Sequence, residues 1–159
     1  MSPFIRTIIF TILVPGFWTV AMPYWLLPRG ARPDLQSAGA ASWLFIVGGI
    51  ALYLACAFWG FALRGKGTPA PFDPPKQLVV EGPYRFVRNP IYWSVASVLL
   101  GEAVVFHSLA LAELTVAFFA GTNLFVLFYE EPILRRKFGA EYEEYCRRVP
   151  RWLPRLKAK

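Results

Sequence analysis

The sequence predicts an all-α integral membrane protein with about four transmembrane helices. Of its 159 residues, 56% are hydrophobic and 17% are aromatic. The apolar residues come in long blocks rather than in amphipathic stripes, which is typical of bilayer-spanning helices. Four blocks reach or approach the roughly 20 residues that a hydrocarbon core requires: Phe4 to Leu27, Ala38 to Leu63, Ile91 to Phe106 and Leu109 to Tyr129.

These blocks leave little chain for a separate soluble domain, so we expect one membrane domain over residues 1–159. It comprises two helices (1–63), a cytoplasmic loop (64–90), a helical hairpin (91–129) and a short, partly helical cytoplasmic tail (130–159). We interpret the first block as a retained, kinked helix rather than a secretion signal. Its apolar run is long, it contains Pro15 and Pro23, and no clear small-residue cleavage site follows it.

Small residues mark the second block, and in lipid such residues let helix backbones approach each other closely. Their expected role is packing, and Gly49→Leu should damage it. The set comprises Gly48, Gly49, Ala51, Ala55 and Gly60.

The segment between the second and third blocks is rich in glycine and proline, which rules out a long regular helix there. Within it, Gln77 to Val80 is a candidate extended stretch that leads into a turn at Gly82 and Pro83. Pro90 suits the first turn of the third helix, where its missing N–H costs nothing.

The distribution of cations predicts the topology. Only Arg29 and Arg32 lie between the first two blocks, and the short link at His107 has no Lys or Arg. The positive-inside rule therefore places both termini and the middle segment in the cytoplasm, with a cell inner membrane as the expected location. The cations on that side are Arg64, Lys66, Lys76, Arg85, Arg88, Arg135, Arg136, Lys137, Arg147, Arg148, Arg151, Arg155, Lys157 and Lys159.

The net charge of +7 is thus largely topological, and it suits contact with anionic lipid head groups. We do not expect nucleic-acid binding, because Glu141, Glu143 and Glu144 interrupt the basic surface of the tail. Cys56 and Cys146 are not expected to pair, and neither belongs to a cluster with metal-ligand spacing. The sequence therefore predicts no metal site, and it says nothing about oligomeric state.

A split polar motif is the candidate functional site. If the hairpin folds back, the residues around Arg88 meet Glu130 and Glu131 at one membrane face. Charged groups near a bilayer are costly and usually serve a function. Free backbone donors before Pro90 and the Arg88 guanidinium suit a carboxylate or phosphate. The candidate residues are Gly82, Tyr84, Arg88, Asn89, Pro90, Tyr92, Glu130 and Glu131.

Two alternatives stay open at this stage. Arg88, Tyr84 and Tyr92 also suit an interfacial anchor, and Glu131 can pair with Arg135 one helical turn later. Asn123 lies seven residues before Glu130, so a polar stripe toward a hydrated cavity is expected, or else a single interhelical hydrogen bond. Glu102, Glu113 and His107, near the outer end of the hairpin, are left out of the site.

These residues carry a resemblance to a known family. The segments resemble those of the isoprenylcysteine carboxyl methyltransferases and the related phospholipid methyltransferases over about half of the chain, roughly Pro71 to Pro154. The first two helices match only in being hydrophobic. The segments are Gly82-Pro83-Tyr84-Arg85-Phe86-Val87-Arg88-Asn89-Pro90-Ile91-Tyr92, Glu130-Glu131-Pro132-Ile133-Leu134, Phe138-Gly139-Ala140-Glu141-Tyr142-Glu143-Glu144-Tyr145 and Val149-Pro150-Arg151-Trp152-Leu153-Pro154.

The resemblance implies a single membrane methyltransferase domain that uses S-adenosyl-L-methionine, with the cofactor site formed by the loop and the tail. It assigns the cofactor to Arg88, Pro90, Tyr92, Glu130 and Glu131. Where the family often has His, this chain has Asn89, which cannot titrate. The residues fit independently, because carboxylates can accept from the cofactor's ammonium or diol, Arg88 can hold its carboxylate, and tyrosines can flank adenine or the sulfonium.

The methyl acceptor stays open. A site at the membrane face favours an amphiphile entering from the lipid: a prenylated carboxylate, a lipid amine, or a small hydrophobic thiol or acid. Arg135 is a candidate for orienting an anionic acceptor, although pairing with Glu131 or with lipid phosphate is the stronger expectation. The alternatives are an NADPH-dependent membrane reductase of the sterol-reductase type and a non-enzymatic membrane protein. Arg88→Ala and Glu131→Gln are expected to weaken cofactor binding and to leave the fold intact.

Overall fold

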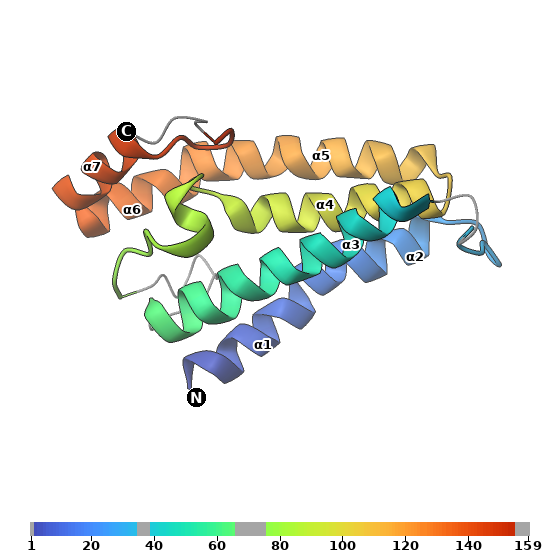
Figure 1. The fold of residues 1–159 in the computed structure, drawn as a ribbon, viewed down its shortest axis with the longest axis horizontal. Helices are drawn as coiled ribbons and strands as arrows, with labels where there is room; N and C mark the ends of the chain where they lie inside the picture. Colours follow the sequence, from blue (N-terminus) through green and yellow to red (C-terminus); the bar gives the residue numbers. More distant parts are fainter. Residues whose placement is uncertain (1, 35–38, 66–75, 155–159) are drawn as a thin grey trace.

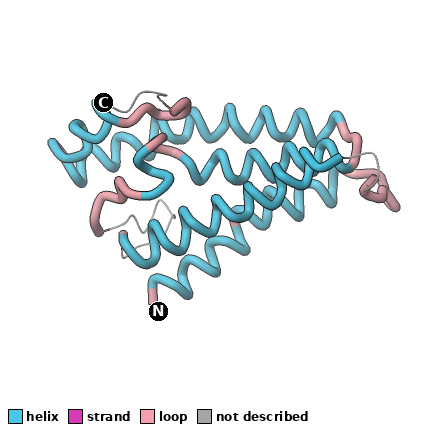
Figure 2. Tube along the Cα trace, in the orientation of Figure 1, coloured by secondary structure: helices cyan, strands magenta, loops and turns pink. Residues whose placement is uncertain are grey.

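The computed structural model describes residues 2–34, 39–65 and 76–154, and every regular element within these ranges is helical (Figure 2). Three helices are long and apolar enough to cross a bilayer, and the 16-residue helix Pro90–Val105 is a shorter apolar one. The predicted class, an all-α integral membrane protein with about four membrane helices, is confirmed. The three long helices are Phe4–Leu26, Gly39–Leu63 and Leu109–Phe138.

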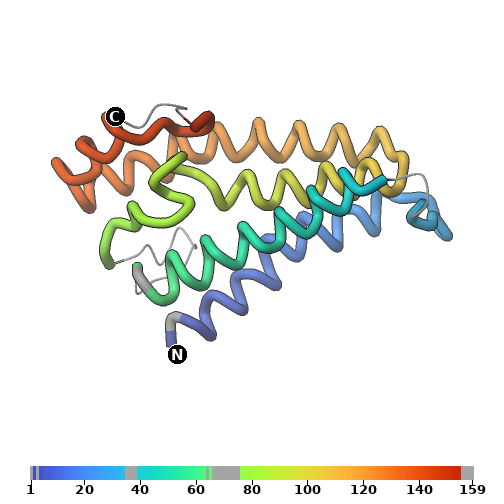
Figure 3. Tube along the Cα trace, viewed as in Figure 1, coloured from blue at the N-terminus to red at the C-terminus, as the bar shows by residue number. Residues whose placement is uncertain are grey.

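The helices form an elongated bundle in which α4 lies between α3 and α5 (Figure 1). The start of α1 lies at one end of this bundle, together with α6 and α7, and we call this the terminal end (Figure 3). α2 and the turn between α4 and α5 lie at the opposite, distal end. The bounds are α1 Pro3–Leu13, α2 Met22–Leu26, α3 Gly39–Leu54, α4 Pro90–Val105, α5 Leu109–Phe125, α6 Glu131–Phe138 and α7 Ala140–Arg148.

The first helix is irregular near Pro15, as predicted. α1 ends at Leu13, a π-helical segment η1 (Phe17–Ala21) follows, and α2 completes the span. Proline has no N–H to donate back along the helix, so the local pattern changes there. Ser2 caps the start of α1 by accepting a hydrogen bond from the Ile5 N–H.

Close packing between α3 and α4 depends on glycine. A Cβ at Gly49 would lie 2.7 Å from the Ser94 carbonyl oxygen, and a Cβ at Gly101 would lie 2.9 Å from the Ser42 carbonyl oxygen. The Ser97 hydroxyl donates to the Phe45 carbonyl at 2.8 Å across the same interface. α4 is thereby held against α3. The π-helical η2 (Ala55–Arg64) continues α3 toward the terminal end.

The last membrane helix is longer than predicted. α5 passes through the π-helical segment η4 (Val126–Glu130) into α6 and ends only at Phe138, where Gly139 takes φ 51°. Glu130 and Glu131 therefore lie inside a continuous helix. The sequence had led us to expect them at the end of that helix. Pro132 is accommodated because it falls in the first turn of α6, where no N–H is needed.

The loop before α4 contains one 3₁₀ turn, η3 (Gly82–Arg85), at the predicted turn position. Gly82 takes φ 59°, and a Cβ there would overlap the Trp59 ring. Both the backbone conformation and the lack of space therefore favour glycine at this position. Gln77 to Val80 forms neither helix nor strand. The proline-rich part of the predicted loop, residues 66–75, and the tail cations Arg155, Lys157 and Lys159 lie outside the described residues.

Candidate functional site

The Glu131 carboxylate lies at the centre of a group of arginines at the terminal end. Glu131 is only 5% exposed. Its oxygens lie 2.9 Å from Arg88 Nη1, 2.6 and 3.1 Å from Arg151 Nε and Nη2, and 3.8 Å from Arg135 Nη2. A carboxylate can stay buried only when counter-charges and hydrogen bonds replace its water. We call Glu131, Arg88, Arg135 and Arg151 the carboxylate cage.

Arg88 reaches this cage from the segment just before α4. Its backbone N–H donates to the Pro150 carbonyl at 2.9 Å, which ties the start of α4 to the C-terminal segment. Its Nη1 also lies within hydrogen-bond distance of Cys146 Sγ (2.8 Å) and the Tyr142 hydroxyl (3.4 Å). Its Nε is buried and has no partner. One edge of this guanidinium is therefore committed to the cage, and the Nε edge carries an unused donor.

α7 closes over the cage through two buried tyrosines. The Tyr145 hydroxyl donates to the Tyr84 carbonyl at 2.7 Å, and Tyr142 packs beside it. Burial raises the pKa of both phenols, and nearby Cys146 further raises that of Tyr142. Both side chains therefore remain neutral at physiological pH. Tyr84 is buried as well, and burial raises the pKa of its phenol well above the usual value.

Glu130 has a different partner from its neighbour. Its Oε2 accepts a hydrogen bond of 2.7 Å from the Tyr92 hydroxyl in the first turn of α4. No other hydrogen bond to the Glu130 carboxylate comes from the described residues. Glu130 is the last residue of the π-helical segment η4, and such segments occur frequently at functional sites. Adjacent carboxylates thus serve different neighbours, since Glu131 binds the arginines and Glu130 binds Tyr92.

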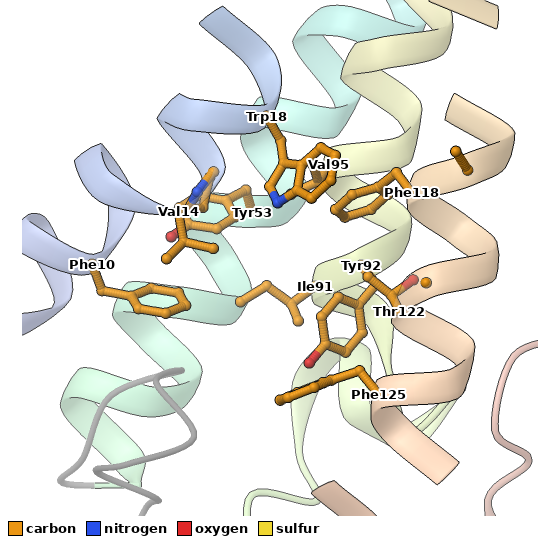
Figure 4. A pocket seen from close by; sticks show the side chains of 13 residues that line it. Phe10, Val14, Trp18, Tyr53, Ile91, Tyr92, Val95, Phe118, Thr122 and Phe125 are labelled. Carbon is orange, nitrogen blue, oxygen red and sulfur yellow. The ribbon is translucent and has the colours of Figure 1, made fainter. Parts of the chain in front are cut away.

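An apolar pocket of about 420 Å³ begins beside Tyr92 and extends between η1, α4 and α5 (Figure 4). Trp18 and Phe118 lie at one end, in edge-to-face contact with ring centroids 5.2 Å apart. Tyr92 and Phe125 lie at the other end, toward Glu130. The pocket is lined by Phe10, Val14, Pro15, Trp18, Tyr53, Ile91, Tyr92, Val95, Ala117, Phe118, Gly121, Thr122 and Phe125. We call it the tail pocket.

The structure brings the two halves of the predicted motif together, because Arg88 contacts Glu131 and Tyr92 contacts Glu130. The other candidates lie around them in supporting positions. Asn89 is 6% exposed, and its amide donates a hydrogen bond to the Arg151 carbonyl at 3.3 Å. The Tyr84 carbonyl accepts a hydrogen bond from the Tyr145 hydroxyl. Gly82 forms the turn and Pro90 begins α4.

Arg135 lies one turn from Glu131, as the structural alternative predicted, and it also forms an ion pair with Glu143. That alternative is confirmed as a contact. A role for Arg135 in orienting an acceptor stays a prediction.

The expected polar stripe from Asn123 to Glu130 is wrong. Asn123 lines a different groove and accepts a 2.8 Å hydrogen bond from Trp152 Nε1. The π-helical segment between the two residues widens the turn, so a seven-residue spacing no longer returns to the same face. Within the described ranges, Glu113 and His107 are exposed at the distal end, and His107 Nε2 lies 3.6 Å from Asp34.

Sequence reasoning missed the residues that the C-terminal segment contributes. Arg151 binds Glu131 through two nitrogens, and Trp152 donates a hydrogen bond to Asn123 of α5. The only available signal was the closing Val149 to Pro154 segment, to which no role had been given. Within the part of the chain that the structure describes, His, Cys, Asp and Glu form no group of three or more that could hold a metal ion.

Sequence comparisons with known proteins identify a family. The sequence model of the phospholipid methyltransferase family matches residues 40–141. A protein-S-isoprenylcysteine O-methyltransferase B from Arabidopsis thaliana is 37% identical over 84 residues, which is 49% of this chain and 40% of the relative. A nickel-cobalt-cadmium resistance protein, NccN, from Alcaligenes xylosoxydans xylosoxydans is 34% identical over 80 residues, covering 50% of this chain and 37% of the relative.

A cobalt-zinc-cadmium resistance protein, CzcN, from Cupriavidus metallidurans is 35% identical over 79 residues, covering 50% of this chain and 36% of the relative. The chain thus matches only about two-fifths of the length of these curated relatives. No solved structure matches the chain.

Proposed function

Because this chain belongs to the phospholipid methyltransferase family, we propose that it transfers a methyl group from S-adenosyl-L-methionine to an amphiphilic acceptor in the bilayer. The observation that carries the proposal is the Tyr92–Glu130 hydrogen bond, which joins the apolar tail pocket to the polar end of the bundle. An amphiphile lying in this pocket has its tail among apolar side chains and its head group beside the carboxylates.

The charged residues suit the cofactor. Arg88 has a buried Nε without a partner, and the Nε edge of a guanidinium can bind a carboxylate. Glu130 retains acceptor capacity beyond the bond from Tyr92, which suits an ammonium group or a ribose diol. We assign the carboxylate of the cofactor to Arg88 and its ammonium or diol to Glu130. Gly82, Tyr84, Asn89, Pro90 and Tyr92 shape the surrounding walls.

Glu131 has a positioning role in this proposal. Its carboxylate already binds Arg88, Arg135 and Arg151, so it orients Arg88 rather than contacting the cofactor itself. Arg151 is likewise committed to Glu131, and Arg135 is shared between Glu131 and Glu143. This differs from the expectation drawn from the sequence, in which Glu131 was a direct cofactor ligand.

The bound cofactor supplies an electrophilic methyl group on a sulfonium. The protein needs chiefly to hold the attacking atom of the acceptor in line with that methyl group and to exclude water. The tail pocket aligns the acceptor, and Tyr92 fixes the position of the Glu130 carboxylate. For an acceptor that carries a proton on the attacking atom, Glu130 is an acceptor for that proton at the polar end of the pocket.

The tail pocket supports an acceptor with one hydrocarbon chain. Its volume of about 420 Å³ lies at the small end of the range for ligand pockets, and its lining is almost entirely apolar. A prenylcysteine-like carboxylate, a single-chain lipid amine or a small hydrophobic thiol or acid meets this requirement. We place the reaction at the cytoplasmic face of a cell inner membrane, with both termini on that side, because the basic residues cluster at the terminal end.

The reductase alternative has less support. NADPH binding needs several free cations for its phosphates, whereas at this site Arg135 and Arg151 form ion pairs with Glu131 and Arg88 offers only its Nε edge. A non-enzymatic role leaves the unused Arg88 Nε without an explanation.

Calorimetric titration of the detergent-purified protein with S-adenosylhomocysteine, and with NADPH in parallel, tests the cofactor assignment. We expect binding of S-adenosylhomocysteine alone. Transfer of tritium from methyl-labelled S-adenosylmethionine to a membrane lipid extract, and separately to N-acetyl-S-farnesylcysteine, then tests the acceptor class. Binding of NADPH alone, or no S-adenosylhomocysteine binding in a lipid nanodisc, overturns the proposal.

A further inference from the structure

A second apolar groove lies on the opposite side of the α4–α5 hairpin from the tail pocket. Its volume is about 630 Å³, and it runs between α3, α4 and α5. The two cavities use alternate faces of α5, since Ala117 and Phe118 line the tail pocket whereas Val116 and Ala120 line the second groove. We call it the outer groove; it is lined by Phe45, Trp93, Ala96, Ser97, Leu100, Thr115, Val116, Phe119, Ala120, Asn123 and Trp152.

The outer groove continues toward the terminal end. Trp93 and Trp152 also line a shallower pocket of about 410 Å³ that contains Phe86 and Leu153. Phe86 and Leu153 are exposed, and the guanidinium of Arg85 lies 4.6 Å from the centre of the Phe86 ring. Arg85 makes no ion pair with a described residue. The combined groove therefore leads from an apolar interior to a free cation.

Three polar side chains line this groove, of which Ser97 and Thr115 donate their hydroxyls to the Phe45 and Leu111 carbonyls, so that Asn123 is the one of the three with an unused donor. Asn123 accepts a hydrogen bond from Trp152 Nε1 through its side-chain oxygen, which fixes the orientation of the amide. Its NH₂ group has no hydrogen-bond acceptor among the described residues. The indole rings of Trp93 and Trp152 both contact Phe119, next to Asn123, and tryptophan favours the membrane–water interface, where lipid ester groups lie. The amide thus offers a donor at the depth of an ester carbonyl.

We propose that the outer groove binds a glycerophospholipid of the bilayer, distinct from the methyl acceptor. Its acyl chain lies along α4 and α5, an ester carbonyl accepts from the Asn123 amide, and its phosphate lies near Arg85. Along the groove, the apolar lining, the Asn123 donor and the Arg85 cation follow each other. The groups they would bind, an acyl chain, an ester carbonyl and a phosphate, occur in the same order in such a lipid. This site does not depend on the proposed methyl transfer.

The bound lipid has a second consequence, which rests on the proposed function. Trp152 follows Arg151, which binds Glu131, and the Trp152 ring lies between Phe119 and Tyr92, with centroids 4.9 and 6.2 Å away. Trp93 Nε1 further donates to the Trp152 carbonyl at 3.0 Å. A lipid against Trp152 therefore holds Arg151 in the carboxylate cage and supports Tyr92, so we expect it to strengthen cofactor binding.

Native mass spectrometry of the full chain, purified in a mild detergent, tests the site directly. Ala120→Trp fills the outer groove, and Ala117→Trp, three residues away on the same helix, fills the tail pocket instead. We expect wild type and Ala117→Trp to retain one phospholipid and Ala120→Trp to lose it. Equal retention by both variants, or loss only in Ala117→Trp, overturns the proposal.

Arg85→Gln provides a test that removes the charge without filling the groove. Delipidated protein titrated with dioleoylphosphatidylglycerol should bind up to about fivefold more weakly in this variant, because one exposed ion pair is lost. Arg136→Gln, an exposed cation on α6, is the control and should bind like wild type. Equal affinity in Arg85→Gln and wild type removes the phosphate assignment.

Titrating delipidated protein with S-adenosylhomocysteine, with and without the same lipid, tests the coupling. We expect tighter binding when lipid is present. Unchanged affinity overturns the coupling alone. Absence of any S-adenosylhomocysteine binding overturns the proposed function, while the retained lipid still reports on the site.

Discussion

Glu130 and Glu131 are neighbours in the chain but occupy opposite environments. Glu131 is surrounded by three guanidinium groups, whereas Glu130 has one neutral partner, the Tyr92 hydroxyl. Because successive residues of a helix point about 100° apart, one carboxylate faces α7 and the C-terminal segment and the other faces α4. We therefore assign a structural role to Glu131 and a cofactor-binding role to Glu130.

Substituting each glutamate separately should distinguish these tasks. Glu130→Gln is expected to weaken S-adenosylhomocysteine binding by about tenfold to a hundredfold, because a charge-assisted hydrogen bond is lost, with little change in thermal stability. Glu131→Gln should weaken binding and also lower the free energy of unfolding by about 3 kcal/mol, since Arg88 loses its buried partner. Calorimetry and thermal unfolding in detergent measure both, with the exposed Glu141→Gln as control. A fully stable Glu131→Gln protein contradicts the positioning role.

Tyr145 makes the docking of α7 sensitive to alkaline pH. Burial raises the pKa of its phenol in the folded protein, so its stabilising effect is complete below the unfolded value of about 10 and is lost as the pH rises through the folded value. Thermal stability of wild type should therefore fall at alkaline pH. Tyr145→Phe should be less stable at neutral pH and fall less steeply, whereas the exposed Tyr24→Phe should behave like wild type. Parallel pH profiles for Tyr145→Phe and wild type rule this out.

The helices pack closely at the α3–α4 contact and leave a cavity, the tail pocket, beside the first helix. Gly49 lets α3 lie directly against α4, while Pro15 and the π-helical η1 redirect the first helix around the tail pocket. In lipid, close van der Waals contact is a main source of helix association. Local departures from regular helix thus create the space that the proposed acceptor occupies.

Two adjacent glycines in α3 provide a matched test of this packing. Gly49→Ala should destabilise the protein, because its Cβ would lie 2.8 Å from a Val98 methyl group and closer still to the Ser94 carbonyl. Gly48→Ala meets nothing within 4 Å and should be neutral or slightly stabilising, by up to about 1 kcal/mol from helix propensity. Thermal unfolding in detergent compares them. Equal effects of the two substitutions would mean that the α3–α4 contact is looser than described.

The contact between Trp18 and Phe118 should limit the length of the acceptor's tail. For S-alkyl-N-acetylcysteines of increasing length, affinity is expected to rise about fourfold per buried methylene until the chain meets Trp18. In Trp18→Ala the increase should continue to longer chains, because the end of the pocket is open. Inhibition of methyl transfer measures the series. Trp25→Ala, 69% exposed on the same helix, is the control and should match wild type.

At the scale of the whole molecule, the arrangement of helices separates two lipid-facing cavities by one hairpin. The tail pocket and the outer groove share the walls formed by α4 and α5 but open on different sides. The C-terminal segment lies against the hairpin, where Trp152 contacts Asn123 and Arg151 contacts Glu131. A movement of this segment would therefore change the lining of both cavities.

The proposed orientation has a direct test. Arg29→Cys, near the distal end, should react with a membrane-impermeant maleimide on intact cells, because the positive-inside rule puts that end outside. Arg136→Cys in α6 at the terminal end should react only after permeabilisation. Both positions are exposed, so accessibility is decided by the membrane and not by folding. The reverse labelling pattern inverts the topology and moves the proposed reaction to the other face.

Much of the architecture could be predicted from the sequence because lipid imposes simple rules. Length and hydrophobicity identified the membrane helices, and Pro90 marked the start of α4 correctly. The end of the last helix was not predicted, because the apolar run stops before the charged Glu130 and Glu131, whereas the backbone continues through the Val126–Glu130 π-helical segment into α6 with Pro132 in its first turn. The same segment explains why Asn123 and Glu130 diverge.

The sequence by itself determined the membrane class, the expectation that the segment around Arg88 lies near Glu130 and Glu131, and the resemblance to methyltransferases, because hydrophobic length, charge placement and motif order are all properties of a linear chain. Only the tertiary structure decided which glutamate is committed to arginines, that Arg151 completes the cage, and that two separate cavities flank the hairpin. These depend on distances between residues far apart in the chain, and such distances are set by how the helices pack.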